Sequence, residues 1–169
     1  MAVLTGLMIT AAVSAAVFLD VIIPPAYSAP ADKTVRDEEG DITVSEKGRE
    51  LDVYRGDTKI WSSPGEILVQ DFLTADIDRD GSSELLILCW KRGRFGKHRP
   101  TWVRSDEIRW SQHIFIYEME GDAVLPKWMA SDIGIKAASW EYRDGMLYIT
   151  DTVGAVTKWK WIHWGLEKM

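Results

Sequence analysis

From residue 41 to the end of the chain, short apolar stretches alternate with turn residues. The stretches are rich in β-branched and aromatic residues and are bounded by Gly, Pro, Asp or Ser, which is typical of strands joined by tight turns. In "KWKWIHW" the alternation has a period of two, so Trp159 and Trp161 share one face of the predicted strand and Lys160 and Ile162 share the other. About ten strands and no strong helical period are present, and we predict an antiparallel all-β fold.

Two pairs of segments repeat within this region. Residues 51–63 ("LDVYRGDTKIWSS") are similar to residues 114–131 ("IFIYEMEGDAVLPKWMAS"), and residues 74–88 align with residues 138–150 when their Asp-Gly turns are superposed. Repetition of this kind predicts four-stranded units like the blades of a propeller. The chain has room for about two units, so we expect a partial propeller, or one that self-associates through its exposed edge strands. The alternative is chance similarity among short strands.

The first thirty residues differ in composition from the rest. Residues 2–19 carry no charge, and Pro24 and Pro25 end any helix there. A small-x-small cleavage pattern follows at Ala29-Pro30-Ala31, so residues 1–31 are expected to be an export signal or a membrane anchor, although the usual basic start is missing. The alternative is a buried core helix.

Charge and composition narrow the class of protein. Residues 32–40 are polar and predict a flexible linker. The expected export signal or anchor places the β-rich domain (residues 41–169) outside the cytoplasm, either secreted or attached to the cell envelope, with the N-terminal segment as its only membrane contact. The net charge of −6 argues against a nucleic-acid binder. The single cysteine, Cys89, excludes an internal disulfide and a cysteine-based zinc site. Because it lies in the apolar run "ELLILCW", we expect a buried, inert thiol.

One predicted loop carries carboxylates at alternate positions. In "DIDRDGSSE", Asp76, Asp78 and Asp80 occupy positions 1, 3 and 5, glycine follows at 6, Ser82 stands at 7 and Glu84 at 9. This spacing lets a short loop wrap oxygen ligands around a hard cation, while the glycine supplies the sharp turn. A divalent cation would also remove the repulsion among the carboxylates.

The loop is not an EF-hand, because its twelfth position is Ile87 instead of a bidentate glutamate and its flanks are strands. It resembles the calcium loop of FG-GAP (integrin α-type, or VCBS) propeller repeats, D-x-D-x-D-G-x-x-D, with glutamate at the ninth position. The resemblance implies one Ca²⁺ held by the side chains of Asp76, Asp78, Asp80 and Glu84 and by the carbonyl of Ser82. The second copy has Trp140 and Tyr142 at ligand positions, so at most one ion is expected. The alternative is a solvated Asp-Gly hairpin without an ion.

Residues 91–112 form a basic insertion with seven Lys and Arg against Asp106 and Glu107. Aromatic residues are interleaved with these cations, and such a loop can dock an anionic polymer, since cations pair with phosphate or carboxylate and rings stack on sugars. The candidate ligand-binding residues are Arg94, Lys97, Arg99, Trp102, Arg104, Arg109 and Trp110. The expected partner is an anionic cell-envelope polymer or a protein. The alternative is a solvated loop that folds onto its own acidic domain.

The chain carries no enzyme signature. Its three histidines lie in no zinc-binding spacing, and neither a G-x-S-x-G motif nor a phosphate-binding glycine loop is present. We therefore expect a non-enzymatic, extracytoplasmic binding or scaffold module stabilised by one Ca²⁺. The alternative is an envelope hydrolase, or an accessory subunit of an extracellular polymer system (capsule or poly-γ-glutamate), with the insertion and the tryptophans forming a substrate cleft.

Overall fold

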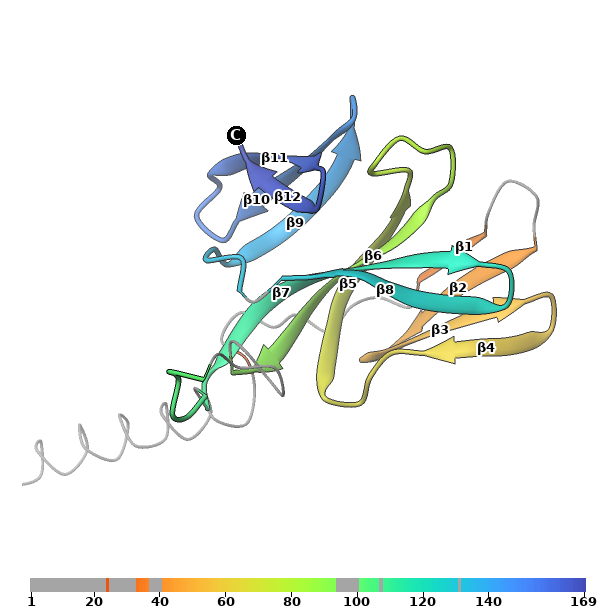
Figure 1. Ribbon diagram of the computed structural model, residues 1–169, viewed down its shortest axis with the longest axis horizontal. Coiled ribbons are helices and arrows are strands. Elements are labelled where there is room, and N and C mark those ends of the chain that lie inside the picture. Colours follow the sequence, from red (N-terminus) through yellow and green to blue (C-terminus); the bar gives the residue numbers. More distant parts are fainter. Residues whose placement is uncertain (1–23, 25–32, 37–40, 94–100, 107, 131) are drawn as a thin grey trace, which may run out of the picture.

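The computed structural model describes most of the chain beyond the N-terminal segment, namely Pro24 and residues 33–36, 41–93, 101–106, 108–130 and 132–169. Within these ranges the chain forms β-strands and no helix, which confirms the all-β prediction (Figure 1). The predicted signal or anchor segment, apart from Pro24, lies outside the described residues. Across the described part of the chain, no helix is long and apolar enough to cross a membrane.

Twelve strands form three open antiparallel sheets of four strands each. The first sheet contains β1 (Lys33–Arg36), β2 (Ile42–Lys47), β3 (Glu50–Arg55) and β4 (Thr58–Ser62). The central sheet contains β5 (Ile67–Ala75), β6 (Glu84–Arg92), β7 (Trp110–Glu120) and β8 (Ala123–Met129). The third sheet contains β9 (Ala137–Arg143), β10 (Met146–Asp151), β11 (Val156–Ile162) and β12 (Gly165–Lys168). In every sheet each strand pairs with its neighbours in sequence.

The structure therefore holds three four-stranded units where about two were expected. The difference begins at β1, a short strand with charged ends inside the segment predicted to be a linker, where Val35 packs against the core. The similar segments of the sequence occupy corresponding places in successive sheets: residues 51–63 include most of β3 and all of β4, and residues 114–131 include most of β7 and all of β8. Likewise, residues 74–88 contain the β5–β6 loop, and residues 138–150 contain the β9–β10 turn.

The central sheet lies between the other two and contributes to two hydrophobic cores (Figure 1). Along β6 the side chains alternate between these cores: Leu85 and Ile87 face the first sheet, and Leu86 and Leu88 face the third. This explains why "LLIL" shows no polar alternation, since a strand buried on both faces has no solvent side. Cys89 is buried as predicted, and burial raises the pKa of its thiol far above the ordinary range.

Asp71 of β5 joins all three sheets. One carboxylate oxygen accepts a hydrogen bond from Lys33 Nζ of β1 at 2.8 Å, and the other accepts from Trp140 Nε1 of β9 at 2.8 Å. The pairing of β5 with β6 shifts register between Val69 and Asp71, which is a β-bulge at Gln70. A bulge re-aims side chains, and here it lies beside a carboxylate that meets both neighbouring sheets.

A buried amide network joins the central and third sheets. Gln70 Oε1 accepts hydrogen bonds from Trp90 Nε1 at 2.6 Å and from Gln112 Nε2 at 2.7 Å. Gln112 also accepts from the Ala137 N–H at 2.6 Å, and its amide donates to the Ala137 carbonyl at 2.9 Å. Buried polar groups are costly unless paired, so this network fixes β9 against the central sheet.

The apolar faces of the two outer sheets point toward the central sheet, and their other faces are polar. In β11, exposed Lys158 and Lys160 alternate with the partly buried Trp159 and Trp161. The outer face of β11 thus carries charged side chains. Association of copies through strand edges remains a prediction.

His113 of β7 is buried, with 1% of its surface exposed. Nδ1 lies 2.9 Å from the carbonyl oxygen of Ala130, and Nε2 lies 2.8 Å from Ser111 Oγ. Burial lowers the pKa of His113 below its ordinary value of 6.5, although the Ala130 carbonyl and nearby Asp132 act in the opposite direction. The folded chain therefore favours the neutral imidazole.

We expect the protein to lose stability as the pH falls below 6.5, the ordinary pKa of His113. In that window the unfolded chain binds a proton that the folded chain does not, so the free energy of unfolding falls by at most about 1.4 kcal/mol per pH unit from this group. Urea unfolding between pH 7.5 and 5 measures the slope. His113→Gln should flatten it, and the exposed His163→Gln should leave it unchanged. Equal slopes in all three proteins would contradict the assignment.

Candidate metal-binding loop

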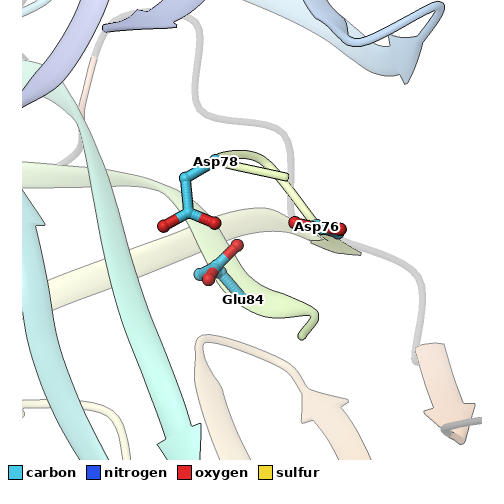
Figure 2. Close-up of side chains that lie close together, drawn as sticks. All are labelled: Asp76, Asp78 and Glu84. Carbon is cyan, nitrogen blue, oxygen red and sulfur yellow. The ribbon is translucent and has the colours of Figure 1, made fainter. Parts of the chain in front are cut away.

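Three carboxylates of the β5–β6 loop converge on one point. Asp76 and Asp78 come from the loop and Glu84 is the first residue of β6; one oxygen from each lies within 4.8 Å of the others. Figure 2 shows the carboxylates of Asp78 and Glu84 turned toward each other, with Asp76 beside them. Calcium–oxygen distances are about 2.3–2.6 Å, so two ligands of one ion can stand up to about 5 Å apart. The group can therefore hold a metal ion.

The loop is shaped by its own carboxylates. The two oxygens of Asp76 accept hydrogen bonds from the backbone N–H groups of Asp80 at 3.1 Å and Gly81 at 3.0 Å. Asp78 also accepts from the Asp80 N–H, at 3.2 Å. These bonds coil the chain so that Arg79 and Gly81 take φ values of 67° and 97°, the second of which suits only glycine without strain.

Two of the five predicted ligands lie outside the group of three. The carboxylate of Asp80 accepts a hydrogen bond from the Ser82 N–H at 2.8 Å, and both residues are exposed. The structure thus brings together Asp76, Asp78 and Glu84, and it gives Asp80 and Ser82 a turn-forming contact. Their role as ligands remains a prediction.

Lys127 of β8 is the member of the site that the sequence did not predict. Its Nζ lies 2.5 Å from Asp78 Oδ2, 2.8 Å from Glu84 Oε1 and 3.0 Å from Glu118 Oε1, and its side chain is 11% exposed. Burial alone would lower the pKa of Lys127, but the hydrogen bonds to the three carboxylates outweigh it and raise the pKa well above the ordinary range. The ammonium group therefore stays charged and offsets part of the negative charge.

The positive charge of Lys127 only partly offsets the cost of burying the carboxylate of Glu84, which is 1% exposed. Burial raises the pKa of Glu84, and the hydrogen bonds from Lys127 and from the Ile77 N–H at 2.9 Å oppose this without cancelling it. The nearby charge of Asp78 raises the pKa of Glu84 further. An additional positive charge at this point would thus be favourable.

The repeated Lys-Trp strand was the only sequence signal for Lys127. Lys127 is 43 residues from Glu84 in sequence. They meet because β6 and β8 both flank β7, which supplies Glu118 between them. The lysine of the similar segment in the first sheet, Lys59, lies one place before the bulge position that Lys127 occupies in the central sheet. It makes only a partly exposed pair with Asp52, at 3.5 Å.

The loop also contacts the third sheet. The hydroxyl of Tyr142 donates to the carbonyl oxygen of Asp76 at 2.8 Å, and Arg79 donates to the carbonyl oxygen of Gly145 at 3.4 Å. Tyr142 occupies a position of the second copy where the first copy has a carboxylate. Where the acidic loop has a candidate ligand, the segment that aligns with it thus has a residue that contacts that loop.

The candidate residues of the basic insertion are only partly described. Arg94, Lys97 and Arg99 lie outside the described residues. Trp102 is 82% exposed, and Arg104 and Arg109 are also exposed. Trp110 is partly buried, and the guanidinium of Arg92 lies 4.8 Å from the centre of its ring. Among the described candidates, Trp110 lines a pocket.

Comparison with known proteins finds no match: no family model fits the chain, and no curated protein or solved structure is significantly similar to it. The described part of the chain is all-β, with three antiparallel four-stranded sheets and an acidic group that can hold a metal ion. The kinship with FG-GAP repeats stays a prediction that rests on the residues of the loop.

Proposed function

We propose that the protein is a non-enzymatic, extracytoplasmic binding or scaffold module stabilised by one Ca²⁺ in the β5–β6 loop. The observation that carries the proposal is the convergence of Asp76, Asp78 and Glu84, with one oxygen of each within 4.8 Å of the others. Placement outside the cytoplasm rests on the composition of residues 1–31.

The chemistry of the group favours calcium over other common cations. All three candidate ligands are carboxylates, which suit hard cations, whereas Zn²⁺ sites in proteins use mainly His and Cys. The ligands come from a short coiled loop and a strand end, and Ca²⁺ accepts irregular oxygen cages of this kind. Mg²⁺ demands near-ideal octahedral geometry and gives up its waters reluctantly.

The position of the loop gives the ion a structural role. The loop joins β5 to β6 of the central sheet, contacts Lys127 of β8 and touches the third sheet through Tyr142. An ion held there would fix the junction between the two sheets. If it binds only the folded chain, it adds about 2.7 kcal/mol to the free energy of unfolding at a hundredfold excess over Kd.

Thermal unfolding in calcium and in chelator tests this proposal. We expect millimolar calcium to raise the melting temperature of the full chain, because extracellular calcium modules typically bind with Kd of roughly 10⁻⁴ to 10⁻³ M. Asp78→Ala should abolish the difference between calcium and chelator. The matched control is Asp57→Ala, in the exposed β3–β4 turn, which should keep it. An unchanged melting temperature in the unmodified protein would contradict the calcium role.

A further inference from the structure

A pocket of about 350 Å³ opens where the basic insertion leaves and rejoins the central sheet. Its volume lies at the lower end of the range for small-molecule sites. One wall is the start of β7, and the other is the segment that leads from the central sheet to β9. The lining residues are Trp90, Trp110, Ser111, Gln112, Asp132, Gly134, Ile135 and Lys136.

The floor of the pocket is held rigidly. Trp90 is fixed by its hydrogen bond to Gln70, and Gln112 is fixed by its three hydrogen bonds to Gln70 and Ala137. A backbone bond from the Ile133 N–H to the Gln112 carbonyl, at 3.1 Å, ties the second wall to the first. A preformed pocket loses little entropy on binding.

The rim is more basic than the chain as a whole, whose net charge is −6. Lys136 lines the pocket and is exposed. Arg92 pairs with Trp110 in the register of β6 with β7 and so stands beside it on the same face, whereas Lys91 points to the other face, over the ring of Phe115. Asp132 also lines the pocket and partly offsets these cations. The balance favours an anionic ligand.

The pocket also offers a flat aromatic surface. The guanidinium of Arg92 lies over the ring of Trp110 and limits its freedom, while Trp110 lines the cavity. An indole ring packs well against the C–H face of a pyranose, and Lys136 can pair with a carboxylate on the same sugar. A flexible polyglutamate chain or a polyphosphate could form ion pairs with the cations, but neither has a flat apolar face that would stack on the indole ring.

We propose that this pocket binds one uronate-type sugar residue of an anionic polysaccharide. The proposal rests on the proposed binding function and names its ligand class. Trp110 would stack against the sugar and Lys136 would pair with its carboxylate. Among the seven candidate residues of the insertion, Trp110 would contact the sugar and Trp102 would not.

Titration of the full chain with tri-galacturonate, followed by calorimetry, tests the assignment. We expect binding that Trp110→Ala and Lys136→Glu each weaken about tenfold or more, an effect equal to about 1.4 kcal/mol. Trp102→Ala is the matched control, since it removes an exposed tryptophan of the same insertion, and it should bind as the unmodified chain does. Lys136 is exposed, so its variant should keep the unmodified melting temperature and report binding alone.

Four results would overturn the proposal. They are no binding at millimolar tri-galacturonate, equal binding of neutral tri-galactose, loss of binding in Trp102→Ala but not Trp110→Ala, and equal binding of poly-γ-glutamate or polyphosphate that Trp110→Ala leaves intact. The calcium melting experiment separates the two proposals. A calcium-dependent melting temperature without sugar binding would reject the pocket assignment and leave the calcium-stabilised scaffold standing.

Discussion

Replacing Lys127 with methionine should lower the free energy of unfolding by about 3 kcal/mol or more in metal-free buffer. Methionine keeps much of the length of the side chain and removes the charge that Asp78 and Glu84 share. The side chain of Glu84 is 2% exposed, so its charge would be left in the protein without its main partner. Removing one partner of a buried ion pair costs more than the pair contributes, because the other charge stays buried.

Lys59→Met is the matched control, because Lys59 is the lysine of the similar segment in the first sheet and also pairs with an aspartate. Its pair with Asp52 spans 3.5 Å, with side chains 52% and 27% exposed. Exposed pairs contribute about 0–1 kcal/mol, so this variant should stay close to the unmodified protein. Urea unfolding of both variants in chelator gives the comparison. If both lose the same small amount, Lys127 does not hold the loop.

Calcium should recover much of the stability lost in Lys127→Met. The variant leaves the oxygens of Asp78 and Glu84 free to take a cation, and no ammonium group competes for them. A larger calcium-dependent rise in stability in the variant than in the unmodified chain would show that ion and lysine act on the same carboxylates. A smaller rise would show that Lys127 assists the ion instead of competing with it.

Periodicity was sufficient to predict most strands, because alternation and turn chemistry are local properties of the chain. β1 and β12 were the exceptions. "KTVR" of β1 offers one strongly apolar residue, Val35, and "GLEK" of β12 offers one, Leu166; each forms a strand because a neighbouring strand and the core lie beside it. The number of sheets was missed for the same reason, since the first unit is incomplete without β1.

The acidic loop was predictable because its carboxylates lie within nine residues. Lys127 was not, because its contact with Glu84 exists only once β6, β7 and β8 have paired. The pocket beside Trp110 was hidden for a similar reason, since its second wall comes from residues 132–136. The sequence of the basic insertion predicted ligand binding by its cations and aromatic residues, whereas the pocket lies where the insertion rejoins the central sheet, at the start of β7.

The three-layer arrangement predicts that both faces of β6 are equally sensitive to truncation. Leu86→Ala and Ile87→Ala should each lower the free energy of unfolding by about 2–5 kcal/mol, the usual cost of removing a buried aliphatic side chain. Both residues are 0% exposed, but they lie in different cores. Val156→Ala on β11, at 57% exposure, is the control and should change stability by no more than about 0.5 kcal/mol.

The pair of variants distinguishes a central sheet from an outer one. In a two-layer protein, neighbouring residues of one strand point alternately to core and solvent, so only one of the two substitutions would be costly. Because Leu86 packs toward the third sheet and Ile87 toward the first, losses of similar size are expected from equilibrium urea unfolding. If Ile87→Ala behaves like Val156→Ala, the first sheet does not cover β6. If Leu86→Ala does so, the third sheet does not cover β6, and the junction that positions the acidic loop against Tyr142 would be lost with it.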